Sequence, residues 1–139
     1  MTGEARTPRV LVIDDCEVAR AEMLECLRGA RFVTSGLDSP IGATRVLVDQ
    51  AIDVVVIDVQ MPSIRGDRLA ALFRDNPRFA DLGVILVSGG NVAELEQLGR
   101  VARADAVLPK SQLDQLVPAI NECLRRRRHG AAAQTRGAH

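Results

Sequence analysis

Short apolar runs alternate with longer amphipathic segments five times along the chain. Most of these runs are rich in Val, Ile and Leu, and they predict β-strands near residues 9–13, 31–35, 53–57, 83–88 and 104–108. Runs that are apolar throughout, rather than at every second position, are typical of strands with both faces covered. The alternation therefore predicts an α/β fold, with a parallel sheet between two layers of helices.

The amphipathic segments predict helices near residues 16–29, 40–50, 66–75, 92–102 and 112–126. Three of these segments come after a helix-start signal: Ser39 before Pro40, Asn91 three residues before Glu94, and Ser111 three residues before Asp114. A chain of 139 residues has room for one domain, which we expect to span residues 9–126 after a leader of residues 1–8. Residues 127–139 are basic and lack an apolar period, so we expect a disordered tail there.

Charge is unevenly distributed, although the formal net charge is zero. The segment that starts at Arg125 holds five Arg and no acidic residue, which leaves 13 basic and 18 acidic residues, a balance of −5, in residues 1–124. An acidic body does not favour direct binding of nucleic acid, which needs a basic face on the fold. We interpret the run Arg125 to Arg128 as a solvated helix end, where cations stabilise the negative pole of the helix.

The three cysteines, Cys16, Cys26 and Cys123, are odd in number and have no C-x-x-C spacing. They favour neither a disulfide framework nor a zinc site. No apolar stretch approaches the roughly 20 residues of a membrane span, and the N-terminus lacks the form of a signal peptide. We therefore expect a cytoplasmic protein without a membrane partner.

Polar residues come directly after four of the apolar runs: Asp14, Asp15, Asp58, Ser88 and Lys110. Lys110 is the only lysine among the 18 basic residues, and an ammonium meets a small anion as a point charge where Arg would present a fork. In a parallel sheet the residues after the strands emerge at one edge, the carboxyl edge, so we expect these side chains to converge.

Three converging carboxylates repel one another unless a cation neutralises them. Oxygen ligands favour Mg²⁺, with Mn²⁺ as the alternative, and Mg²⁺ leaves a position for a phosphate oxygen. A metal ion, a carboxylate, a hydroxyl and an ammonium around one volume are the components of phosphoryl transfer.

At this point the sequence resembles the receiver domain of bacterial two-component response regulators, over about residues 9–126. The resemblance rests on five motifs in this order: Val-Leu-Val-Ile-Asp14-Asp15, Val-Val-Ile-Asp58-Val-Gln-Met61-Pro62, Gly66, Val-Ser88-Gly89 and Leu-Pro109-Lys110. It implies a flavodoxin-like receiver fold, in which a five-stranded parallel sheet of order 2-1-3-4-5 is flanked by five helices.

The resemblance also implies a role for each metal ligand. Asp58 would be the phosphoacceptor, and Asp15 and Asp58 would bind Mg²⁺ directly. Asp14 would act mostly through water, and the main-chain carbonyl of Gln60 would complete the protein ligands. Pro62 and Gly66 are interpreted as structural residues of the loop after Asp58.

Ser88 would hydrogen-bond a phosphoryl oxygen and shift toward it, while Lys110 would pair with another oxygen. The phosphoryl donor would be a histidine kinase or a histidine phosphotransfer protein, and the domain would catalyse only its own phosphorylation and dephosphorylation. The signal would leave through residues 92–126, which would bind an unidentified protein target or a second copy of the chain.

Two positions depart from the family pattern. Val107 stands where many receivers have Tyr or Phe, so the signal must pass by other packing changes through the Ser88 loop, and Ser111 stands where Pro often comes after the lysine. Three alternatives stay open: a receiver-like scaffold that works without phosphorylation, an excised regulatory domain of a larger effector protein, and an aspartyl-phosphate phosphatase. The phosphatase alternative is disfavoured because Cys16, not a second Asp, lies two residues after Asp14.

Overall fold

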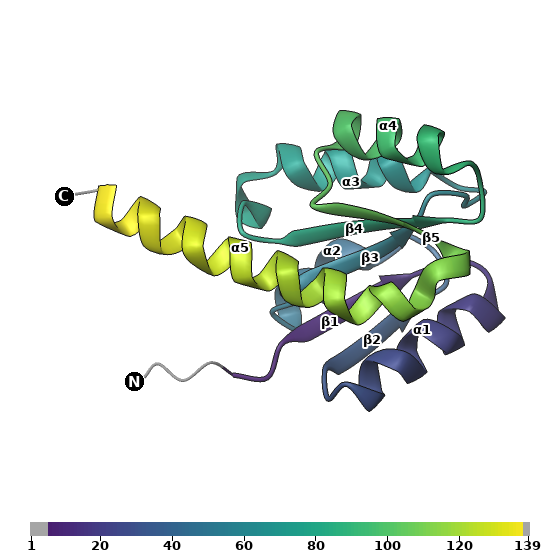
Figure 1. The fold of residues 1–139 in the computed structure, drawn as a ribbon, viewed down its shortest axis with the longest axis horizontal. Coiled ribbons are helices and arrows are strands. Elements are labelled where there is room, and N and C mark those ends of the chain that lie inside the picture. Colours follow the sequence, from purple (N-terminus) through teal and green to yellow (C-terminus); the bar gives the residue numbers. More distant parts are fainter. Residues whose placement is uncertain (1–5, 138–139) are drawn as a thin grey trace.

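The computed structural model of the chain describes residues 6–137, with side chains described up to Arg127. Its core is a five-stranded parallel sheet of order β2-β1-β3-β4-β5 (Figure 1). The strands are β1 (Arg9–Ile13), β2 (Val33–Leu37), β3 (Val54–Asp58), β4 (Gly83–Ser88) and β5 (Ala106–Pro109). The predicted fold class and strand order are therefore confirmed.

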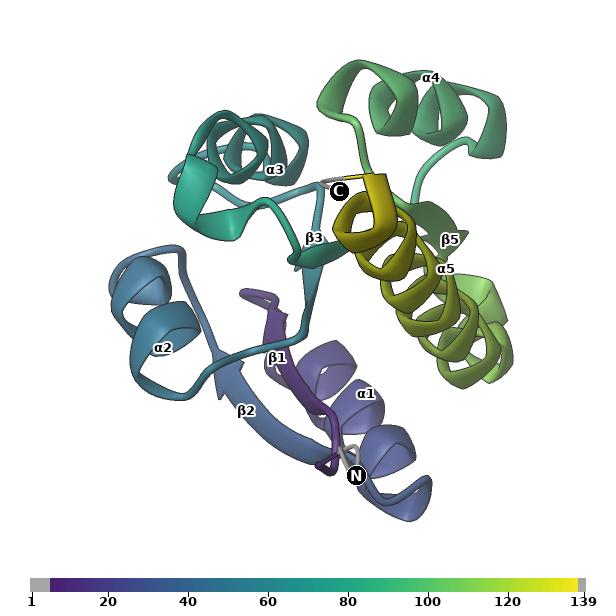
Figure 2. The ribbon, with the colours of Figure 1, turned by 90° about the vertical axis from the view of Figure 1, so that its left-hand side faces the viewer.

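Five α-helices cover the two faces of the sheet. They are α1 (Glu17–Gly29), α2 (Ala43–Asp49), α3 (Gly66–Asp75), α4 (Val92–Ala102) and α5 (Leu116–Gly137). Figure 2 shows α1 and α5 on one face and α2, α3 and α4 on the other, and a separate apolar cluster fills each interface. Every residue of β3 and β4 is buried, which explains why their sequences are apolar on both faces.

Both edge strands begin two residues later than the sequence predicts. The reason is the same in each case, because a residue in the left-handed region first ends the preceding helix. Arg31 takes φ 70° after α1, and Arg103 takes φ 59° after α4. The next amide then bonds back to the helix, from Phe32 to the carbonyl of Leu27 at 3.1 Å in the first case.

Helix-start signals were correct at one of three positions. Asn91 caps α4, since its Oδ1 accepts a hydrogen bond from the amide of Glu94 at 3.2 Å. The prediction for Ser39 was wrong: its Oγ accepts from the amide of Ile41 in a preceding turn, and α2 begins only after Gly42, at φ 83°. The local signal there forms a turn, because the left-handed Gly42 interrupts the helical backbone.

The last helix differs from the prediction at both ends. Residues Lys110–Gln115 form a 3₁₀ segment, η2, so Ser111 caps no α-helix, and α5 begins at Leu116. At the other end α5 continues to Gly137 without a break at residue 126, whereas we expected disorder from residue 127. Arg, Ala and Gln, which are frequent in this part, all favour a helical backbone.

The basic run on α5 also differs from its interpretation as a solvated helix end. Arg125 does pair with Glu122 on the helix surface, at 3.0 Å from its Nε. Arg126, however, donates to the carbonyl of Asp105 at 3.0 Å, and Arg127 contacts both carboxylate oxygens of Asp105 at 2.8 Å. Two of the three arginines in this run whose side chains are described therefore join α5 to Asp105, the residue before β5.

Three further points concern the ends of the chain, membrane spans and the peptide bond after Lys110, whose isomer the sequence left open. Residues 1–5 of the predicted leader and residues 138–139 of the predicted tail lie outside the described residues. Within the part that is described, no helix is both long enough and apolar enough to cross a membrane. No peptide bond in that part is cis, so the bond between Lys110 and Ser111 is trans.

Candidate functional site

The predicted site residues meet at the carboxyl edge of the sheet. Asp14 and Asp15 come after β1, Asp58 ends β3, Ser88 ends β4 and Lys110 comes after β5. One carboxylate oxygen from each aspartate lies within 4.8 Å of the other two. The Lys110 ammonium lies 2.9 Å from Oδ2 of Asp14 and 3.4 Å from Oδ1 of Asp58. Parallel strands thus bring together residues that are up to 96 positions apart, from Asp14 to Lys110.

Asp14 is fully buried, and both its main chain and its side chain are hydrogen-bonded. Its amide donates to the carbonyl of Leu37 at 3.1 Å, and its Oδ1 accepts from the amide of Cys16 at 2.9 Å. Its Oδ2 has no hydrogen bond of suitable geometry among the described residues, but it lies 2.9 Å from the Lys110 ammonium. A buried carboxylate oxygen whose one close cation is a side-chain ammonium can also act as a ligand for a metal cation.

Asp58 is also buried, with 2% of its surface exposed. Burial, aided by the charge of Asp14, raises its pKa to about 6. Two contacts lower the pKa of Asp58 but do not cancel this rise: a hydrogen bond from the amide of Gln60, at 3.2 Å, and the charge of Lys110. For Lys110, burial lowers the pKa, but contacts with Asp14 and Asp58 outweigh it and leave the pKa raised. The site therefore has an excess of negative charge that one ammonium does not neutralise.

Asp15 and Ser88 differ in exposure. Asp15 is exposed at the mouth of the site, whereas Ser88 is buried. The Oγ of Ser88 accepts a hydrogen bond from the amide of Gly90 at 3.0 Å, which leaves its hydroxyl hydrogen available to a ligand oxygen. Beside this loop lies a small cavity of about 50 Å³, and Gln60, Ser88 and Gly90 contribute to its lining.

The three carboxylates fit a hard divalent cation. All their donor atoms are oxygens, they lie close enough to share one ion, and Oδ2 of Asp14 is buried without a hydrogen bond. Mg²⁺ suits such a set, because it binds one or two carboxylates and retains several waters. The part assigned to the main-chain carbonyl of Gln60 stays a prediction.

Gly66 places the acceptor strand against the start of α3. A Cβ atom on Gly66 would overlap the main-chain carbonyl of Asp58, so only glycine allows this approach. The amide of Gly66 also donates to the carbonyl of Val59 at 2.9 Å. The interpretation of Gly66 as a structural residue therefore agrees with its contacts.

One site residue was missed in the sequence. Arg20, on α1, donates from Nη1 to the main-chain carbonyl of Asp14 at 2.7 Å. No sequence signal distinguishes Arg20 from the other arginines, because the bond depends on how α1 lies against the sheet. Cys16, between the acidic pair and α1, is exposed, and its amide rather than its thiol contacts the site.

Comparison with known proteins agrees with this geometry. Residues 10–121 match the family described as the response regulator receiver domain. The gliding motility regulatory protein of Myxococcus xanthus is 30% identical over 109 residues, which are 78% of this chain and 14% of that protein. The two-component response regulator ORR11 of Oryza sativa subsp. indica is 29% identical over 91 residues, 65% of this chain and 62% of that protein. The chain thus spans less than two thirds of the length of either relative.

Solved structures share the fold. The signal receiver domain of an HD domain-containing protein from Pseudomonas fluorescens Pf-5 superposes with a TM-score of 0.83, over 95% of this chain and 97% of that chain. Its sequence identity is 18%, so this likeness shows the fold alone. The family match is more informative, because it spans most of the chain and contains every residue of the site. The chain therefore belongs to the response regulator receiver domain family.

Proposed function

We propose that this domain is a cytoplasmic phosphoacceptor switch that takes a phosphoryl group onto Asp58 with the help of Mg²⁺. Membership of the receiver family supports phosphoacceptor function in two-component signalling generally. One observation carries the finer proposal: the buried Asp58 is one of three clustered carboxylates, and a single ammonium, Lys110, pairs with only two of them, Asp14 and Asp58. Such a charge excess is costly unless the site receives a cation, and a bound cation in turn favours a phosphoryl group.

The donor would be a phosphorylated histidine of a kinase or phosphotransfer protein. A carboxylate oxygen of Asp58 attacks the phosphorus, the new O–P bond forms, and the P–N bond to the histidine breaks. Mg²⁺, when held by Asp15 and Asp58 and aided by Asp14, supplies positive charge to the phosphoryl oxygens. Lys110 pairs with one of these oxygens, and the Ser88 hydroxyl donates to another. Hydrolysis of the acyl phosphate by water returns Asp58 to its first state, so the chemistry is confined to the domain itself.

The conformational response would run through the loop after β4. A shift of Ser88 toward the phosphoryl group moves Gly89 and Gly90, and the Asn91 cap joins that loop directly to α4. A Cβ on Gly99 of α4 would overlap the side chain of Val107, so α4 lies directly on β5. Movement of α4 must therefore change its packing on β5, without the aromatic side chain that many receivers use.

The consequence of this movement would be altered binding of a protein target through residues 92–126, or of a second copy of the chain. The match covers only 14% of the length of the Myxococcus xanthus relative. This supports a further possibility, in which the domain regulates a longer protein that contains it. No observation on the site favours an aspartyl-phosphate phosphatase, because the position two residues after Asp14 is the exposed Cys16. The beryllofluoride titration described next distinguishes the scaffold that works without phosphorylation from the phosphorylation switch.

Beryllofluoride, which mimics a phosphoryl group on a carboxylate, provides the test. The protein is titrated with Mg²⁺ and beryllofluoride while amide NMR shifts are followed, with Asp58→Asn as the matched control. We expect Mg²⁺-dependent shifts that spread from Ser88 into residues 92–110 in the wild type only. Equal shifts in the variant would move the acceptor elsewhere, and shifts confined to the site would favour a scaffold that works without phosphorylation.

A further inference from the structure

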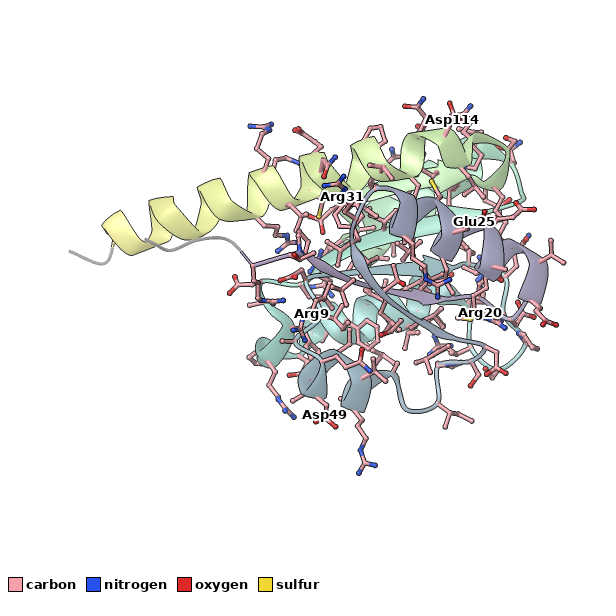
Figure 3. All side chains as sticks on the ribbon, turned by 90° about the horizontal axis from the view of Figure 1, so that it is seen from below. Arg9, Arg20, Glu25, Arg31, Asp49 and Asp114 are labelled. Carbon is pink, nitrogen blue, oxygen red and sulfur yellow. The ribbon has the colours of Figure 1, made fainter. Side chains whose placement is uncertain are left out.

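Arg20 is the one cation on α1 that reaches the site. Its Nη1 donates to the main-chain carbonyl of Asp14 at 2.7 Å, although its Cα lies one helical turn into α1. The side chain is partly buried, and Figure 3 shows it pointing from α1 toward the strands. Its guanidinium donates to a main-chain carbonyl, and no ion pair with a carboxylate is found for it among the described residues, so its effect on the site is through the backbone of Asp14.

Gly36 on β2 makes room for this side chain. A Cβ there would stand 2.9 Å from Cδ1 of Leu24 and 3.5 Å from Cδ of Arg20. The absence of a side chain at Gly36 therefore lets α1 lie close to β2 and lets the aliphatic part of Arg20 cross the strand. This path directs the guanidinium to the loop after β1, where Asp14 and Asp15 lie.

The bond from Arg20 acts on the peptide that joins the two aspartates. The amide and side chain of Asp14 are already held by Leu37, Cys16 and Lys110. Its carbonyl belongs to the same planar unit as the amide of Asp15, so fixing that oxygen fixes the direction in which Asp15 leaves the strand. Asp15 itself is exposed and makes no hydrogen bond among the described residues, so its placement depends on this peptide.

We propose that Arg20 is a positioning residue that orients Asp15 toward a divalent cation held with Asp14 and Asp58. This inference rests on the metal site of the proposed function. For the removal of Arg20, the positioning role predicts weaker binding of the cation, whereas the loss of its charge alone predicts stronger binding. Removing a positive charge near the site should by itself strengthen binding of a cation, whereas losing the orientation of a ligand weakens it.

The test is direct Mg²⁺ titration of Arg20→Met by calorimetry or amide NMR, which needs no activity. Loss of a residue that orients a metal ligand typically weakens binding by about 10-fold or more. We therefore expect the Kd of Arg20→Met to rise about 10-fold. Arg28→Met is the matched control: it removes the same charge from the same helix, and the side chain of Arg28 donates to Thr34 Oγ1, at 3.2 Å, and not to any site residue among the described residues. Its Kd should stay at the wild-type value.

A Kd for Arg20→Met that is unchanged or lower than that of the wild type would overturn the inference alone. Failure of the wild type to bind Mg²⁺ would instead overturn the proposed function and the inference with it. If Arg20→Met does not fold, Arg20→Lys decides the matter. It keeps the charge but replaces the planar fork with a single ammonium donor, and we expect a Kd about threefold above the wild type. A wild-type Kd in Arg20→Lys would then refute the positioning role.

Discussion

Two clusters of charge lie at opposite ends of the same strands, and they differ in balance. At the amino edge, the carboxylate of Asp105, just before β5, accepts from the amide of Val84 at 2.8 Å, from Arg74 at 2.6 Å and from Arg127 at 2.8 Å. At the carboxyl edge lie three carboxylates, and Lys110, just after β5, pairs with two of them, Asp14 and Asp58. The four-residue strand β5 thus connects a cluster in which the one carboxylate is fully paired to one in which the carboxylates outnumber the cation.

The difference separates a structural cluster from the one that the proposed function uses. The carboxylate of Asp105 has partners on both oxygens, and it joins α3, β4 and α5. Burial lowers the pKa of Arg74, and the charge of Asp105 counteracts only part of that effect. At the other edge burial raises the pKa of Asp58 to about 6, and one oxygen of Asp14 has no hydrogen bond among the described residues. A protein retains such an unfavourable arrangement where a ligand completes it.

Breaking the balanced cluster should have the largest effect. Asp105→Ala leaves the largely buried guanidinium of Arg74 and the amide of Val84 without their acceptor. Removing one partner of a buried ion pair typically costs about 3–5 kcal/mol, and we expect a loss of that size in the free energy of unfolding. Urea unfolding followed by circular dichroism measures it, because the chain has no Trp or Tyr for fluorescence.

Asp75→Ala is the control for this prediction. Asp75 also pairs with an arginine, Arg103, at 2.6 Å, but 66% of its side chain is exposed. Exposed pairs contribute about 0–1 kcal/mol. If both variants lose the same small amount, the cluster at the amino edge is not the anchor that its hydrogen bonds indicate.

Relieving the unbalanced cluster should instead stabilise the fold when Mg²⁺ is absent. The pKa of Asp58 rises from 3.8 to about 6 on folding. Protonation of Asp58 therefore stabilises the folded state; this stabilisation is fully present below pH 4 and is lost as the pH rises through 6. A difference of this size corresponds to at most about 3 kcal/mol. Asp58→Asn carries no charge to bury, so above pH 6 it should be the more stable protein by up to that amount.

The measurement is urea unfolding of the wild type and Asp58→Asn in EDTA at pH 4 and pH 7.5. The two proteins should differ at pH 7.5 and converge at pH 4, and added Mg²⁺ should reduce the difference by stabilising only the wild type. Asp75→Asn should show no such dependence on pH. A wild type that is the more stable protein at pH 7.5 in EDTA would mean that the carboxyl edge is not under charge strain.

The smallest effects should distinguish neighbouring arginines on α5. Arg127 donates to Asp105 and, at 2.9 Å, to the carbonyl of Ala80, whereas the adjacent pair of Arg125 with Glu122 is exposed. Arg127→Met should lower the free energy of unfolding by about 1.5 kcal/mol, because hydrogen bonds to charged groups are lost. Arg125→Met should leave the unfolding midpoint unchanged. Equal effects would support the interpretation of the whole run as a solvated helix end.

Sequence signals failed for two reasons, local backbone conformation and contacts between distant residues. Ser39 and Ser111 both have helix-start signals, yet the left-handed Gly42 and the 3₁₀ segment η2 delay the next helices. The composition of the basic run on α5 indicates a solvated segment, but Arg127 finds a partner 22 positions away in Asp105. Local patterns do not contain such contacts, because they arise only when the helices lie on the sheet.

The sequence by itself determined the fold class, the strand order through the family motifs, and the meeting of Asp14, Asp15, Asp58, Ser88 and Lys110. The physical reason is that the period of apolar residues defines the strands, and parallel strands place the residues at their carboxyl ends along one edge. Only the tertiary structure decided which charges are balanced. Side chains such as Arg20 and Arg127 span several ångströms from their helices, and their partners depend on how each helix lies on the sheet, which the pattern of residues along the chain does not specify.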